Sequence, residues 1–157
     1  MAQCCLGWCY EFGKGVELDE ARAVELYRAA AEQGLPRAQC CLGYCTEKGI
    51  GTEADPAAAA EWYRRSAEGG YSRGMYNYAC CFENGTGVKK DLPLAQQWYE
   101  RAAKEGLPDA MYELGVWYED GRCGPKDAAQ ALAWYKKAAE AGHDRARKAV
   151  ERMEKLV

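Results

Sequence analysis

The sequence predicts an all-α fold, a right-handed α/α superhelical solenoid of four helix–turn–helix repeats followed by a C-terminal capping helix. The 157 residues align with themselves at an offset of 36 without insertion or deletion. Each repeat holds two stretches in which small and apolar residues recur three and four positions apart, and no stretch shows the alternation of a strand. We therefore expect a single repeat domain over residues 1–157, with repeats at about 2–37, 38–73, 74–109 and 110–145 and a cap at 146–157.

The first helix of a repeat is clearest at residues 38–48. Ala38, Leu42, Cys45 and Thr46 share one face there at spacings of three and four. The glycine-containing segment 49–52 ends this helix, because glycine adopts the positive φ of a helix C-terminus and a tight turn.

The second helix begins at an aspartate. The Asp55 carboxylate can accept from free amide groups of the first turn, and Pro56 is tolerated in that turn because its missing N–H would have no partner. An apolar stripe then runs along Ala59, Trp62, Tyr63, Ser66 and Ala67, and Gly70 ends the helix.

Two short helices cannot cover their own apolar face, so neighbouring pairs must stack. Small residues allow the two helices of a repeat to approach closely, and large aromatic side chains should fill the space between pairs. These are Trp62, Trp98 and Trp134 with Tyr27, Tyr63, Tyr99 and Tyr135. A glutamate recurs near the end of each first helix, at Glu11, Glu47, Glu83 and Glu119. We interpret this column as an architectural contact, not as an acid–base pair.

The last segment, 144–156, is a more charged version of a first helix. Ala146, Ala149, Val150 and Met153 share its inner face, and Arg147, Lys148, Glu151 and Arg152 face outward. A terminal repeat needs such a polar outer side, so this helix is predicted to be the cap.

Composition excludes several classes of protein. With 24 acidic and 21 basic residues the formal charge is −3, which lacks the basic excess of nucleic-acid binders. The longest apolar runs are far too short for a bilayer, and no basic flank with an apolar core opens the chain. We expect a monomeric cytoplasmic protein with neither nucleic-acid nor membrane partners; a truncated N-terminus would leave secretion open.

The repeat resembles the Sel-1-like repeat, a relative of the tetratricopeptide repeat. The first copy carries its composite pattern at Ala2, Leu6, Gly7, Tyr10, Gly13, Gly15, Val16, Asp19, Ala23, Tyr27, Ala30, Ala31 and Gly34, and the pattern recurs four times in register. The period of 36 also differs from the tetratricopeptide period of about 34. The resemblance implies an adaptor that holds protein partners together. It implies no chemistry.

The nine cysteines are a departure from the pattern of the resembled family. Eight lie on first helices, none on a second helix, and Cys123 lies in a turn. A cysteine-rich branch of the resembled family joins the two helices of each repeat by a disulfide, which this distribution does not allow. We predict reduced, buried thiols. The alternative is a zinc or haem site on the i, i+4 pairs Cys5 with Cys9 and Cys41 with Cys45.

An enzyme is not predicted, and no cofactor is expected. The sole histidine, His143, follows a repeat-ending glycine in a position held elsewhere by Leu35, Tyr71 and Leu107, so a packing role is favoured over that of a base. The glycine-rich turns lack the strand and Lys-Ser/Thr context of a phosphate-binding loop.

The predicted function is a protein-interaction scaffold that binds a peptide or a partner helix in a groove lined by the first helices. Side chains that point away from the second helices vary from repeat to repeat, as a binding surface within a fixed frame would. The candidate contact residues are Trp8, Phe12, Arg37, Tyr44, Lys48, Asn77, Asn84 and Glu113. The alternative for Trp8 and Tyr44 is packing between adjacent first helices. The basic run on the second helices, which includes Arg64 and Arg65, is interpreted as a solvated outer face.

Overall fold

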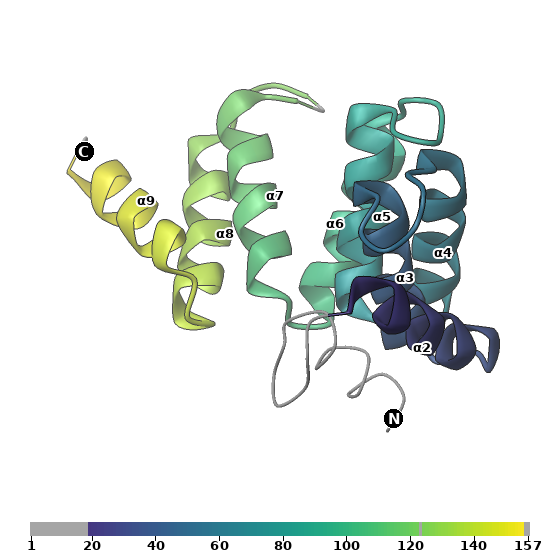
Figure 1. Ribbon diagram of the computed structural model, residues 1–157. Coiled ribbons are helices and arrows are strands. Elements are labelled where there is room, and N and C mark those ends of the chain that lie inside the picture. Colours follow the sequence, from purple (N-terminus) through teal and green to yellow (C-terminus); the bar gives the residue numbers. More distant parts are fainter. Residues whose placement is uncertain (1–18, 123, 156–157) are drawn as a thin grey trace. The chain divides into compact units, whose positions relative to one another are not determined.

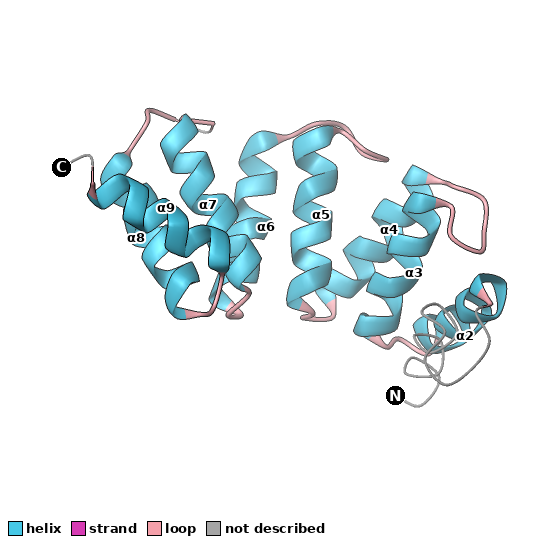
Figure 2. Ribbon diagram, turned by 60° about the vertical axis from the view of Figure 1, so that its left-hand side comes forward, coloured by secondary structure: helices cyan, strands magenta, loops and turns pink. Residues whose placement is uncertain are grey.

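The computed structural model describes residues 19–122 and 124–155, and within them every regular element is an α-helix (Figure 1). The chain divides into two compact units, within residues 1–90 and 91–157, which are described separately. The first contains α2 (Glu20–Glu32), α3 (Pro36–Lys48), α4 (Pro56–Glu68) and α5 (Ser72–Asn84). The second contains α6 (Leu92–Lys104), α7 (Pro108–Asp120), α8 (Ala128–Glu140) and α9 (Asp144–Glu154). Short loops join these helices (Figure 2), and the predicted all-α repeat fold is confirmed.

Local capping sets the ends of the helices, as predicted. The second helix of each described repeat starts at an aspartate whose Oδ1 accepts a backbone N–H three residues on, at 2.9–3.0 Å: Asp19, Asp55, Asp91 and Asp127. The first helices α3, α5 and α7 end at glycines with left-handed φ: Gly49, Gly85 and Gly121. The first helices begin two residues earlier than expected, because Pro36 and Pro108 are accommodated in the first turn.

The tyrosine column forms the core of both units. Tyr27, Tyr63, Tyr99 and Tyr135 are each about 1% exposed. Small residues make room for them: a Cβ on Gly43 would lie 2.8 Å from the Tyr63 ring, and one on Gly115 would lie 2.5 Å from the Tyr135 ring. In the repeats of Tyr63 and Tyr135, the predicted close approach of the two helices therefore depends on glycine at this position.

The tryptophan column differs from the prediction that it fills the space between pairs. Trp62, Trp98 and Trp134 are only partly buried, and each ring is covered by a cation one turn on. Arg65 lies 4.9 Å from the Trp62 ring centre, Arg101 lies 4.6 Å from that of Trp98 and Lys137 lies 4.4 Å from that of Trp134. Each tryptophan directly precedes a core tyrosine, so its side chain is turned by about 100° around the helix axis and reaches the edge of the core and not its centre.

The turn after each first helix of the first unit contacts the start of a second helix from the preceding repeat. Gly51 and Gly87 have φ of +64° and +71°. A Cβ on Gly51 would meet the backbone of Glu20, and one on Gly87 would meet the backbone of Pro56. Ser66 adds a hydrogen bond between α4 and α3, since its Oγ donates to the Pro36 carbonyl at 2.6 Å.

The packing role predicted for His143 is confirmed. Its Nδ1 accepts the N–H of Ala146 at 3.1 Å and caps α9, and its Nε2 lies 3.2 Å from Asp109 Oδ1. Its ring also stacks on Tyr112 with a centroid distance of 4.5 Å. Ala146 and Ala149 of α9 are buried as predicted.

Replacing His143 by alanine is expected to lower the free energy of unfolding by about 1–2 kcal/mol, because the cap and the ring contacts are lost together. Asparagine restores a capping side chain without the ring, so His143→Asn should recover part of this loss. Urea unfolding of both variants, followed by circular dichroism, measures the difference. Equal stability of wild type and His143→Ala would contradict the assigned role.

Candidate functional site

A cavity of about 200 Å³ opens between α3 and α5 in the first unit. Four of the residues predicted to contact a partner line it: Tyr44, Lys48, Asn77 and Asn84. Glu47, Tyr63, Cys80, Cys81 and Thr86 complete its lining. The structure therefore brings together, from two successive first helices, half of the predicted contact set.

The floor of this cavity is a fixed polar pair. The Tyr63 hydroxyl donates to Glu47 Oε2 at 2.8 Å, which confirms the architectural role predicted for this glutamate. Burial, followed by the hydrogen bond to Glu47, raises the pKa of Tyr63, so the phenol keeps its proton. Glu47 Oε1 accepts from Lys48 Nζ at 3.1 Å, and this bond raises the pKa of Lys48. The lysine is therefore a partly compensated cation at the rim.

The walls expose groups suited to recognition. Tyr44 is 44% exposed and is the one exposed large hydrophobic side chain among the described residues. Lys48 and Asn84 are exposed, whereas Asn77 is half-buried and its Nδ2 donates to Cys40 Sγ at 3.4 Å. Tyr44 therefore lies on the surface, and the alternative of packing between first helices does not describe it.

A second cavity, of about 450 Å³, occupies the equivalent position in the second unit between α7 and α9. Its floor repeats the first: the Tyr135 hydroxyl donates to Glu119 Oε2 at 2.7 Å. Six lining positions correspond two repeats apart: Tyr44 to Val116, Glu47 to Glu119, Lys48 to Asp120, Tyr63 to Tyr135, Asn77 to Ala149 and Cys80 to Arg152. The tyrosine and glutamate are kept, and the other four side chains change their chemistry.

The remaining predicted contact residues lie elsewhere. Arg37 is exposed beside a separate shallow hollow with Leu35 and Tyr71 and does not line the first cavity. Arg37 and Lys48 lie at opposite ends of α3, and a helix of 13 residues is about 20 Å long. Glu113 is half-buried on α7 and lines neither cavity. Trp8 and Phe12 lie outside the described residues.

None of the eight candidate contact residues lines the second cavity, whose wall on α9 includes Arg145, Lys148 and Arg152. The sequence pattern predicts only a solvated outer side of the cap for Lys148 and Arg152. The repeat register itself points to this wall, because α9 corresponds to a first helix and Arg152 lies in the same variable column as Tyr44 and Cys80.

Among the described cysteines, Cys40, Cys45 and Cys81 are buried, and Cys41 and Cys80 are partly buried. Cys45 is 1% exposed in the core formed by α2 and α3, and Cys41 packs partly buried against the same core. Cys81 is buried beside the first cavity, and desolvation raises its pKa to about 12. Within the described part of the chain no three His, Cys, Asp or Glu side chains are grouped to hold a metal ion. Cys5 and Cys9 of the alternative metal site lie outside that part.

The fold and the two cavities define the class of this protein: it is an α-helical repeat protein with cavities at equivalent positions of two repeats, lined by different side chains. The family model of the Sel1 repeat matches residues 1–35, 36–71, 72–107 and 108–143, and the chain belongs to this family. Proteins of the family are generally scaffolds for protein–protein interaction, and the fold is typically non-enzymatic. None of the described helices is long and apolar enough to span a membrane.

Solved structures agree with this assignment. A Sel1 repeat protein from Oxalobacter formigenes is 35% identical with a TM-score of 0.86, over 95% of this chain and 59% of that one. The protective antigen c5321 of uropathogenic Escherichia coli is 34% identical with a TM-score of 0.82, over 96% of this chain and 32% of that one. Cysteine-rich protein B of Helicobacter pylori is 26% identical with a TM-score of 0.66, over 87% of this chain and 98% of that one. The chain thus spans less than two thirds of the first two proteins. No protein with a curated description matches it.

Proposed function

We propose that this chain is a non-enzymatic interaction module that binds a peptide segment of a partner protein in the groove between successive first helices. One observation carries the proposal: the same groove position recurs in both units on the same tyrosine–glutamate floor, while its lining changes. A constant floor maintains the fold, and a variable lining is what distinguishes one partner from another.

The first cavity suits a side chain of a partner. Its volume of about 200 Å³ is below the range of about 300–1,000 Å³ typical of small-molecule sites. Tyr44 supplies an exposed aromatic surface of the kind enriched in binding hot spots, and the amides of Asn77 and Asn84 supply directional hydrogen bonds beside it.

The chemistry of this cavity favours recognition over catalysis. The Tyr63 phenol is held protonated by burial and by Glu47, and the raised pKa of Cys81 keeps its thiol neutral near pH 7. Neither group is therefore activated as a nucleophile or a base. We place the module in a reducing compartment such as the cytoplasm, where a buried thiol such as that of Cys81 stays reduced.

Selection of displayed random peptides on the full chain tests the proposal. The selected peptides should bind Tyr44→Ala at least tenfold more weakly than wild type, because truncation of an aromatic hot spot costs about 2 kcal/mol. Arg37→Ala is the matched control on the same helix and should leave the affinity unchanged. Failure to select any peptide would refute the proposal, and equal affinity for wild type and Tyr44→Ala would exclude the first cavity as the binding site.

A further inference from the structure

The groove between α7 and α9 carries a charge that its counterpart in the first unit lacks. Its wall on α9 is formed by Arg145, Lys148, Ala149 and Arg152. Within the proposed interaction function, on which this inference rests, we propose that this groove selects an acidic peptide segment. Arg145 and Lys148 bind its carboxylates, and the apolar lining receives a neighbouring apolar side chain.

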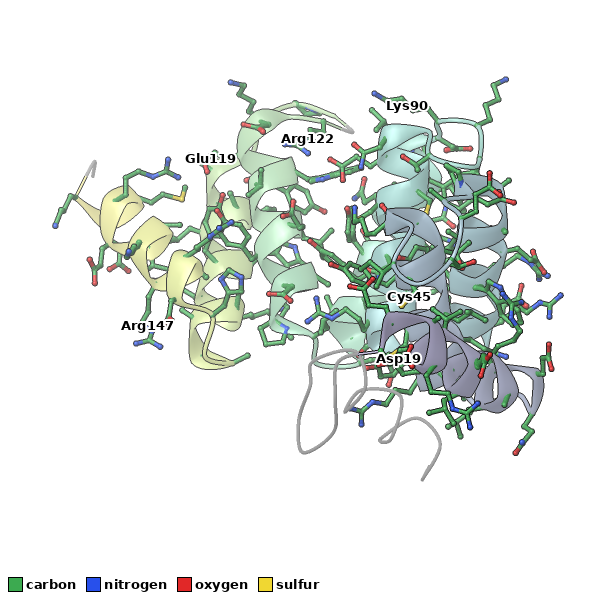
Figure 3. All side chains as sticks on the ribbon, in the orientation of Figure 1. Asp19, Cys45, Lys90, Glu119, Arg122 and Arg147 are labelled. Atoms are coloured by element: carbon green, nitrogen blue, oxygen red, sulfur yellow. The ribbon has the colours of Figure 1, made fainter. Side chains whose placement is uncertain are left out.

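The two acidic residues of the groove are already neutralised. A single guanidinium nitrogen of Arg152 donates to both carboxylate oxygens of Glu119, at 2.7 and 2.8 Å, and Tyr135 also donates to this group. Asp120 Oδ2 accepts from Nε and a terminal nitrogen of Arg122, at 3.3 and 3.2 Å. Glu119 and Arg122 lie near the same end of the second unit in Figure 3. Neither acid therefore compensates the remaining cations of the groove.

Arg145 and Lys148 are those remaining cations. Both side chains are exposed, and within the described residues neither forms an ion pair. Neighbouring basic residues of α9 differ: Arg147 pairs with Asp144 at 3.0 Å, and Arg152 pairs with Glu119. Residues three apart on a helix share a face, so Arg145 and Lys148 present two uncompensated charges to the same groove.

The rest of the lining suits a peptide. Tyr112, Val116 and Ala149 supply apolar surface between the two walls, and the cavity of about 450 Å³ is larger than that of the first unit. Residues three apart on one helical face have Cβ atoms about 5–6 Å apart, close to the spacing of residues i, i+3 or i, i+4 in a helical peptide and to the roughly 6–7 Å of residues i, i+2 in an extended one. A nucleic acid would not use the apolar surface, and the chain as a whole has a formal charge of −3.

The first groove provides an internal contrast. Its rim cation, Lys48, is paired with Glu47 at 3.1 Å. Arg73 and Tyr76 occupy the positions equivalent to Arg145 and Lys148, and the Arg73 guanidinium lies over the Tyr76 ring at 5.5 Å. Selectivity for acidic partners is therefore assigned to the second unit alone.

Fluorescence anisotropy with the full chain tests this assignment. The probe is a fluorescein-labelled peptide of repeating Glu-Glu-Leu, compared with a Gln-Gln-Leu peptide of equal length and with an oligothymidylate. We expect the Glu-Glu-Leu peptide to bind at least tenfold more tightly than either. Arg145→Gln combined with Lys148→Gln should remove that advantage, and the affinity should fall as salt increases.

Lys89→Gln combined with Lys90→Gln is the matched control, since it removes the same charge from exposed residues outside both cavities. It should leave the affinity for the Glu-Glu-Leu peptide unchanged. An equal loss in both double variants, equal binding of the two peptides, or tighter binding of the oligonucleotide would overturn the inference.

Peptides whose binding depends on Tyr44 should bind the Arg145→Gln, Lys148→Gln variant as they bind wild type. If they bind and the Glu-Glu-Leu peptide does not, this inference fails and the proposed function stands. If no selected peptide depends on Tyr44 while the Glu-Glu-Leu peptide binds through Arg145 and Lys148, the first groove fails as a binding site and this inference stands.

Discussion

Replacing Gly87 by alanine is expected to lower the free energy of unfolding by more than about 3 kcal/mol, the largest effect of one added methyl group among the described glycines. Gly87 has φ of +71°, which alanine adopts at a cost of about 1–2 kcal/mol. The added Cβ would also overlap the Pro56 carbonyl oxygen and lie 2.5 Å from its carbon. Those atoms are backbone at the start of α4, so they cannot rotate away as a side chain would.

Gly70→Ala separates the two causes of this loss. Gly70 has φ of +88°, and no atom lies within 4 Å of a Cβ built on it. This variant should lose only the conformational part, about 1–2 kcal/mol. Urea unfolding of the full chain, followed by circular dichroism at matched concentrations, measures both variants. Equal losses would show that the contact between the turn and the start of α4 does not constrain the fold.

Truncating Tyr63 to alanine is expected to cost about 3–5 kcal/mol, because an aromatic ring that is 1% exposed leaves a cavity among α3, α4 and α5. Tyr63→Phe keeps the ring and removes only the donor to Glu47, so it should cost about 1 kcal/mol. The order of the two losses follows from packing: most of the contribution of Tyr63 comes from its ring.

Tyr44→Ala is the matched control for the same deletion on the surface. Tyr44 is 44% exposed, so its truncation should change the free energy of unfolding by no more than about 0.5 kcal/mol. Thermal and urea unfolding of the three variants give the comparison. A loss in Tyr63→Phe as large as that in Tyr63→Ala would contradict the packing argument and assign the stability to the hydroxyl group.

The two tyrosines also connect stability with function. Tyr63 lies on the floor of the first cavity and Tyr44 lies on its rim. Tyr44→Ala is therefore expected to weaken binding of the selected peptides while the fold is retained. This separation is what allows the lining of a repeat to change while its frame persists.

Sequence alone determined the helices and the composition of the core. The aspartate caps and the left-handed glycines act through contacts within a few residues, so the ends of α4 and α5 could be predicted from local chemistry. The period of 36 residues placed Tyr63 and Tyr135 in the core, because a column that recurs in every repeat faces the same surroundings each time.

The columns also predicted part of the first cavity. Tyr44, Lys48, Asn77 and Asn84 were selected because their positions vary while those around them do not, and the structure places all four around one cavity. Arg37 was selected for its charge alone. Its separation from Lys48 along α3 is a distance that a column pattern does not contain.

Only the tertiary structure decided which charges remain available for a partner. Arg145, Lys148 and Arg152 are equally basic in the sequence, yet Arg152 is paired with Glu119, which precedes it by 33 residues. Asp120 is likewise neutralised by Arg122. Ion pairing depends on distances of a few ångströms between side chains. Only the packing of α7 and α9 therefore shows that Arg152 is paired while Arg145 and Lys148 remain available for a partner.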